Sequence, residues 1–206
     1  MEKFETPFVA ITDAIASHAK WRPDRTALVC GDQRLMWREF NQAIDRVANG
    51  LIKGGMHKGD KVSVLMLNSI EMLEIMMGTV KAGGVIVPLS VMLTAESLAT
   101  MINDSDSRVI FVGAPFTRVI DSIRCDLLNI SSEGFFVVGD ETEDWIDYQG
   151  WRGEFTDAPP HVRLTLADDF NLIYSSGTTG TPRVSRTRTT RVSRPPTYWP
   201  LSLASI

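Results

Sequence analysis

The sequence contains no apolar run long enough to cross a membrane. Its 206 residues are 44% hydrophobic and 22% charged, which is ordinary for a globular protein that can bury a sizeable core. No stretch reaches the roughly 18 apolar residues of a spanning helix, and Met1–Glu5 lacks the basic start and apolar stretch of a secretory signal. The sequence therefore predicts no membrane span and favours a cytoplasmic protein.

Cysteine and histidine are both scarce. The two cysteines, Cys30 and Cys125, are far apart and form no CxxC pair, and the three histidines, His18, His57 and His161, are scattered. Zinc sites and disulfide frameworks need clustered or regularly spaced ligands. The sequence therefore predicts no metal site on these residues, and each cysteine is expected to be a small buried apolar residue.

Acidic residues are absent from the last 24 positions. All 25 acidic residues precede residue 183, whereas five of the 21 basic residues follow Pro182. These five are Arg183, Arg186, Arg188, Arg191 and Arg194. The abrupt change in composition predicts a boundary between residues 1–182 and a basic tail, 183–206.

Strands and helices alternate through most of the chain. Helical spacing of apolar residues and glycine or proline stops mark the helices, and short β-rich runs mark the strands. Helices are predicted at 9–19, 37–52, 69–82, 94–104 and 117–128, and strands at 26–30, 34–36, 61–67, 85–87, 108–112, 134–138 and 170–174. This order predicts an α/β fold with a mostly parallel sheet covered by helices on both faces.

Several conspicuous residues have simple structural interpretations. Residues 139–167 are rich in acids and turn formers and predict a surface connection. The methionines of the helix after residue 69, Met72, Met76 and Met77, are interpreted as core packing. Asp60 is predicted in a turn, Asn68 or Ser69 as a helix cap and Lys81 in a last helical turn, where a cation suits the helix dipole.

A loop after the strand 170–174 carries the clearest functional signal. Seven consecutive residues contain only serine, glycine and threonine: Ser175, Ser176, Gly177, Thr178, Thr179, Gly180 and Thr181, followed by Pro182 and Arg183. Glycines allow close approach of backbone N–H groups to an anion, and the hydroxyls add further donors. The loop is not a Walker A motif, because no Lys-Ser or Lys-Thr follows Gly180. A flexible linker is the structural alternative, but it would not need the apolar strand before it.

Five segments, in order, resemble the adenylate-forming (AMP-binding) superfamily, and within it the acyl-CoA synthetases. They are Trp37–Phe40, Lys58–Val62, Asn68–Glu71, Lys81–Leu89 and the loop Tyr174–Arg183. The resemblance runs from about Phe8 to Pro182, so residues 1–182 are expected to be the amino-terminal part of an AMP-binding domain and an incomplete subdomain of that fold.

The resemblance implies an acid–thiol ligase. Such enzymes join a carboxylate to ATP, release pyrophosphate and pass the acyl group to the thiol of CoA. It implies that Ser175, Ser176, Gly177, Thr178, Thr179, Gly180 and Thr181 hold the β and γ phosphates with Mg²⁺, and that Arg183 forms the cationic edge. No catalytic residue is assigned, because those of the family follow this loop. The identity of the acid and the oligomeric state stay open.

The tail departs from the family pattern within two residues of Arg183. It is rich in Arg, Ser, Thr and Pro and is expected to be irregular. Codons can be chosen for residues 184–206 so that the neighbouring reading frame spells a family-like continuation with histidines. We therefore hypothesise a frameshift, which the gene sequence would test, and expect this chain alone to form no detectable thioester.

Two other functions remain open on the sequence. The loop alone would also suit a non-catalytic nucleotide-binding module. The basic tail could bind nucleic acid, although the acidic body would repel a phosphate backbone and we expect no nucleic-acid partner. A salt-sensitive shift of labelled DNA, lost on deleting residues 184–206, would reverse that preference.

Overall fold

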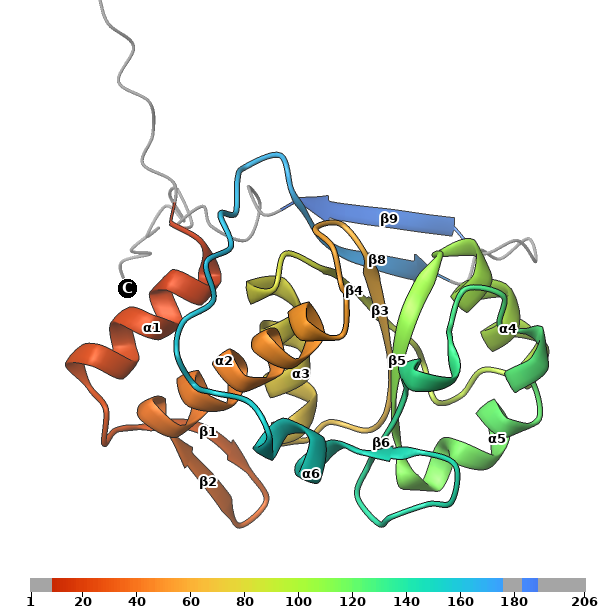
Figure 1. Ribbon diagram of the computed structural model, residues 1–206, viewed down its shortest axis with the longest axis horizontal. Helices are drawn as coiled ribbons and strands as arrows, with labels where there is room; N and C mark the ends of the chain where they lie inside the picture. The colour runs from red at the N-terminus through yellow and green to blue at the C-terminus, as the bar shows by residue number, and fades with distance from the viewer. Residues whose placement is uncertain (1–8, 176–182, 189–206) are drawn as a thin grey trace, which may run out of the picture.

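The computed structural model describes residues 9–175 and 183–188 and has a central sheet between two layers of helices (Figure 1). The seven strands lie in the order β7-β6-β5-β3-β4-β8-β9, and a separate hairpin pairs β1 with β2. The strands are β1 (Thr26–Cys30), β2 (Gln33–Met36), β3 (Lys61–Leu65), β4 (Val85–Pro88), β5 (Ser107–Gly113), β6 (Phe135–Val138), β7 (Ile146–Asp147), β8 (Asp169–Ser175) and β9 (Arg183–Arg188). The helices are α1 (Ile11–Trp21), α2 (Trp37–Lys53), α3 (Ile70–Lys81), α4 (Ala95–Asp104), α5 (Thr117–Asp121) and α6 (Tyr148–Gly153).

All neighbouring strands from β7 to β8 pair in parallel, and only β8 and β9 pair antiparallel. Parallel neighbours need crossover connections, and α3 and α4 supply them after β3 and β4. The predicted α/β class with a mostly parallel sheet is confirmed.

Helices cover both faces of the sheet, with α1, α2 and α3 on one side and α4 and α5 on the other (Figure 1). The first core cluster includes Ile44 and Val47 of α2 with Ile75 of α3. The second core cluster includes Leu98 and Ile102 of α4. All five side chains are almost completely buried. Burial of apolar side chains against both faces is what a parallel sheet requires, and the prediction of two covered faces is confirmed.

Two helix starts follow the capping pattern of the sequence. The Ser69 hydroxyl accepts a hydrogen bond from the Met72 N–H at 3.1 Å, and the Thr94 hydroxyl accepts one from the Ser97 N–H at 3.3 Å. Each bond satisfies one of the N–H groups that the first helical turn leaves unpaired. Of the two predicted caps, Ser69 is the one that caps α3, and Asn68 does not.

The helix predicted over residues 117–128 is shorter in the structure. Helix α5 ends at Asp121, and a single 3₁₀ turn follows at residues 124–126. The Asn103 amide donates to the Asp126 carbonyl at 2.8 Å and accepts from the Leu128 N–H at 3.0 Å. The Asn103 side chain thus pairs the backbone groups of Asp126 and Leu128 that a continuing helix would have paired. Between them, Leu127 packs in the second core cluster.

Residues 139–167 are more than a surface connection. They contain β7 and α6, and Trp145 and Tyr148 are buried with exposures of 8% and 0%. The prediction missed these elements because a few aromatic residues are separated by acids and turn formers. Those aromatic residues have too little periodicity to mark a strand or helix.

The prediction of two buried cysteines is wrong. Cys30 is half-buried at the end of β1, and Cys125 is exposed in the 3₁₀ turn that follows α5. Neither position lies inside a core layer, because β1 belongs to the two-stranded hairpin and the turn lies at the surface.

The tail also differs from expectation where it is described. Residues 183–188 form β9, which pairs with β8, although an irregular chain was predicted from residue 183 on. Alternating Ser and Thr with Arg suits an edge strand with solvent-exposed side chains. Residues 189–206 lie outside the described part. Among the helices described, none is long and apolar enough to cross a membrane.

Candidate functional site

Strands β8 and β9 bring the two ends of the predicted phosphate-binding loop together. Ser175 is the Cα partner of Arg183 in the antiparallel register. The chain therefore leaves the sheet after Ser175 and re-enters it at the neighbouring position, Arg183. Ser176, Gly177, Thr178, Thr179, Gly180 and Thr181 lie outside the described residues, and Ser175 and Arg183 are placed by their backbone. The predicted loop is thus the connection of a β-hairpin at the border of the sheet.

A β-bulge lets β8 contact both core clusters. Asp169 pairs with Arg188 and Asn171 with Thr187, so Phe170 is the extra residue of the bulge. Phe170 is buried in the first core cluster, whereas Leu172 is buried in the second. Side chains of β8, the strand that precedes the loop, therefore pack in the core on both faces of the sheet.

Tyr174 ties the carboxyl end of β8, just before the loop, to α4. Its hydroxyl donates a hydrogen bond to the Asp104 carboxylate, with 2.7 Å between the oxygens. Burial, and then this bond and the charge of Asp104, raise the pKa of Tyr174 well above its ordinary value. The phenol therefore keeps its proton to a higher pH than a free tyrosine, and its hydrogen bond fixes the strand next to Ser175. The sequence placed Tyr174 in the motif but gave no signal for its partner, 70 residues away.

Asp168 anchors the other end of β8. Its carboxylate lies 2.8 Å from the Lys58 ammonium and accepts the Thr165 N–H at 2.6 Å. Lys58 also donates to the Arg163 carbonyl at 2.9 Å. Burial acts to raise the pKa of Asp168, but Lys58 and the Thr165 N–H outweigh it and hold that pKa below 3.8.

The contact of Asp168 with Lys58 is expected to stabilise the fold more at neutral than at acidic pH. Because the pKa of Asp168 is lowered in the folded state, its contribution is fully present above about pH 4 and is lost as the pH falls through the folded pKa. Asp168→Asn should lower the free energy of unfolding at pH 7 by about 1 kcal/mol. Urea unfolding of both proteins from pH 7 to pH 3 measures the difference, which should shrink below pH 3.8. A difference that stays constant, or one that the exposed control Asp32→Asn reproduces, would contradict the assignment.

The residues set aside as structural have structural partners. Asp60 accepts the His57 N–H at 2.8 Å within its turn. The Lys81 ammonium lies 2.6 Å from the fully buried Asp45 carboxylate and donates to Asn41. Lys81 therefore joins α3 to α2 by an ion pair, which goes beyond the helix-dipole role expected for it.

Metal ligands are not clustered in the described chain. No group of three or more His, Cys, Asp or Glu residues there could hold a metal ion. The predicted loop is rich in hydroxyl and backbone N–H donors, which suit phosphate oxygens, and β8 and β9 hold its two ends, Ser175 and Arg183, side by side.

Comparison with known proteins agrees with this arrangement. Residues 15–184 match the family described as AMP-binding enzyme. The chain is 30% identical over 172 residues to the medium/long-chain-fatty-acid–CoA/3-oxocholest-4-en-26-oate–CoA ligase of Mycobacterium marinum, a match that covers 78% of this chain and 30% of that protein. It is 32% identical over 155 residues to the long-chain-fatty-acid–CoA ligase FadD13 of Mycobacterium tuberculosis, covering 74% of this chain and 29% of that protein.

A solved structure shows the same fold. The anthranilate CoA ligase AuaEII, in complex with anthranoyl-AMP, superposes with a TM-score of 0.84 at 26% identity, over 92% of this chain and 36% of that one. The chain thus spans about a third or less of the length of these relatives. The family match over most of the chain, the superposition and the hairpin that joins the two ends of the loop lead to one conclusion: the chain belongs to the AMP-binding enzyme family.

Proposed function

We propose that this chain is the phosphate-binding part of an AMP-forming acyl-CoA synthetase. The proposal rests on the pairing of β8 with β9. It makes Ser175 and Arg183 neighbours at the two ends of a segment of Ser, Gly, Thr and Pro. The relatives with the same fold are named as CoA ligases of fatty, sterol and aromatic acids. A carboxylate substrate, ATP and CoA are therefore the proposed partners.

The proposed reaction has two balanced steps. A carboxylate oxygen attacks the α phosphorus of ATP, the bond to the bridging oxygen breaks, and pyrophosphate leaves. The thiol of CoA then attacks the acyl carbon, loses its proton, and AMP leaves with the oxygen that the carboxylate had contributed. Both steps depend on holding charged groups in position, a positioning and electrostatic role.

The loop would act on the pyrophosphate half of ATP. Backbone N–H groups and the hydroxyls of Ser175, Ser176, Thr178, Thr179 and Thr181 are donors that suit phosphate oxygens. Arg183 would add a positive charge at the end of the loop, which favours the departing pyrophosphate. When Mg²⁺ is bound with ATP it supplies further neutralisation of the phosphate charge.

A rigid base for the loop supports this role. Tyr174 ties the strand before the loop to Asp104, and Lys58 ties the start of the same strand through Asp168. Fixing the strand that precedes the loop limits the conformations open to the start of the loop, which lowers the entropy cost of binding.

Calorimetric titration with MgATP tests the proposal. MgATP should bind, and AMP, which lacks the β and γ phosphates, should bind at least tenfold more weakly. Thr178→Ala with Thr179→Ala should weaken MgATP binding by about tenfold or more, because each lost hydrogen bond to a charged group is worth about 1.5–3 kcal/mol. Thr100→Ala is the matched control, since Thr100 is an exposed threonine of α4.

Three results would count against the proposal: no MgATP binding, equal binding of AMP, or an unchanged affinity in the double variant. Carboxylate-dependent exchange of labelled pyrophosphate into ATP tests the chemical step separately. This chain alone is expected to give no exchange, because it is expected to form no thioester. Exchange with any carboxylate would contradict that expectation and would rule out the non-catalytic nucleotide-binding module.

A further inference from the structure

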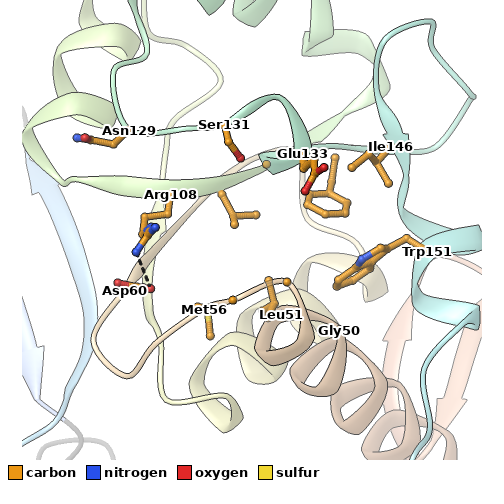
Figure 2. Close-up of a pocket in the computed structure, with 15 residues that line it drawn as sticks. Gly50, Leu51, Met56, Asp60, Arg108, Asn129, Ser131, Glu133, Ile146 and Trp151 are labelled. Carbon is orange, nitrogen blue, oxygen red and sulfur yellow. Dashed lines mark ion pairs between the residues drawn. The ribbon is translucent and has the colours of Figure 1, made fainter.

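A cavity of about 310 Å³ lies away from the loop, between the carboxyl end of α2, the amino ends of β5 and β6, and α6 (Figure 2). Its residues come from none of β4, β8 and β9. Strands β3 and β4 separate β5 from β8 in the sheet, which places β5 about 14 Å from β8 at the usual strand spacing. The cavity is therefore distinct from the candidate phosphate site.

One end of the cavity is apolar and aromatic. Its lining includes Leu51, Met56, Val109, Phe136, Ile146 and Trp151. The rings of Phe136 and Trp151 are tilted by 60° with centroids 4.8 Å apart. Trp151 lies against α2 because position 50 is glycine, where a Cβ would come within 2.5 Å of the indole. An apolar cavity of about 150 Å³ can hold benzene, so this cavity has room for an aromatic ring with a short polar arm.

The charges around the cavity favour a cation. Asp60, Arg108 and Glu133 line it, and the Arg108 guanidinium faces Asp60 at 3.6 Å (Figure 2). Arg108 and Asp60 offset each other. Glu133 has no hydrogen bond or ion pair with the described part of the chain, and Figure 2 shows it on the same side of the cavity as Trp151. The uncompensated charge is thus a carboxylate in the same cavity lining as the rings of Phe136 and Trp151.

We propose that this cavity binds a hydrophobic organic cation, an alkyl- or arylalkyl-ammonium. The apolar body would displace water from Leu51, Met56 and Val109, which stabilises the complex in proportion to the apolar surface that it buries. The ammonium would lie between the Glu133 carboxylate and the rings of Trp151 and Phe136, where ion pairing and cation–π attraction act together. This inference does not depend on the proposed ligase function.

Three probes of nearly equal size and different charge test the proposal: 3-phenylpropylamine, 3-phenylpropanol and 3-phenylpropionate. Ligand-observed NMR titrations at pH 7 should give an affinity about tenfold higher for the amine than for the alcohol, and the weakest binding for the carboxylate. Glu133→Gln should remove most of the preference for the amine and leave the affinity for the alcohol within about twofold. Glu96→Gln is the matched control, because Glu96 is an exposed acid of α4.

A second variant locates the binding. Ser131→Trp places a large side chain at an exposed position of the cavity lining and should abolish binding of all three probes, with thermal unfolding confirming that the variant is folded. The proposal is overturned if no probe binds at millimolar concentration, if the carboxylate binds best, or if Glu133→Gln keeps the preference. Unchanged binding in folded Ser131→Trp would place the probes elsewhere and would equally overturn it.

Discussion

Gly78→Ala is expected to lower the free energy of unfolding by about 2–3 kcal/mol, although alanine alone would favour the helix by about 1 kcal/mol. Gly78 lies in α3 where that helix crosses α2. A Cβ there would be 2.5 Å from Val47 Cγ1, 2.6 Å from Val47 Cβ and 3.2 Å from the Ile44 carbonyl oxygen. Two of these atoms belong to a fully buried side chain and the third to the backbone, so the helices must move apart.

Urea unfolding followed by far-ultraviolet circular dichroism measures this effect. Gly54→Ala is the control, because a Cβ at that position meets its nearest atoms at 3.4 and 3.5 Å, at ordinary contact distance. It should change the free energy of unfolding by less than about 0.5 kcal/mol. The double variant Gly78→Ala with Val47→Ala should lose less free energy of unfolding than the sum of the losses of the two single variants, because the smaller side chain at position 47 removes the clash. A Gly78→Ala protein as stable as the parent would contradict the close packing of α2 on α3.

Arg152→Met is expected to destabilise the protein by about 3 kcal/mol, because it leaves a buried carboxylate without its counter-charge. Glu74 of α3 is 3% exposed and accepts hydrogen bonds at the same oxygen from the Tyr148 hydroxyl, at 2.8 Å, and from Arg152. Burial, and then the charge of Glu74, raise the pKa of Tyr148 well above its ordinary value. The tyrosine therefore remains a neutral donor and cannot replace the lost positive charge.

Two further variants show whether burial is the cause. Arg38→Met removes an equally charged side chain whose pair with Asp24, at 3.0 Å, is exposed, and it should cost less than about 0.5 kcal/mol. Glu74→Gln combined with Arg152→Met should be more stable than Arg152→Met alone, because no unpaired charge remains buried in this cluster. Equal losses for Arg152→Met and Arg38→Met in urea unfolding would show that the Glu74 cluster contributes no more than a surface pair.

Local patterns were enough to predict most of the elements. The strand Val62–Leu65 and the apolar periodicity of α2 and α3 follow directly from side-chain spacing, and Ser69 and Thr94 occupy capping positions that local chemistry favours. Prediction was wrong where distant residues decide the local structure. Asn103 ends α5 early through its bonds at Asp126 and Leu128, and the aromatic residues of α6 become helical only against the first core cluster.

For the candidate site as well, part could be predicted from the sequence and part could not. Its residue types can be recognised in the sequence because seven Ser, Gly and Thr residues in a row have few uses other than contact with an anion or a flexible linker. The order of the sheet cannot be recognised there, nor can the partners Asp104 and Lys58, which contact β8 from about 70 and 110 residues away. These contacts depend on how the layers pack, and no local periodicity encodes them.

The sequence by itself determined the α/β class, the family and the residue types of the loop, because hydrophobic periodicity, motifs and loop composition are local properties of the chain. Only the tertiary structure decided that Ser175 and Arg183 are neighbours, that residues 183–188 join the sheet, and that Glu133 and two aromatic rings line the same cavity. Each of these depends on pairing or packing between residues distant in sequence, and such contacts form only when the two core clusters assemble around the sheet.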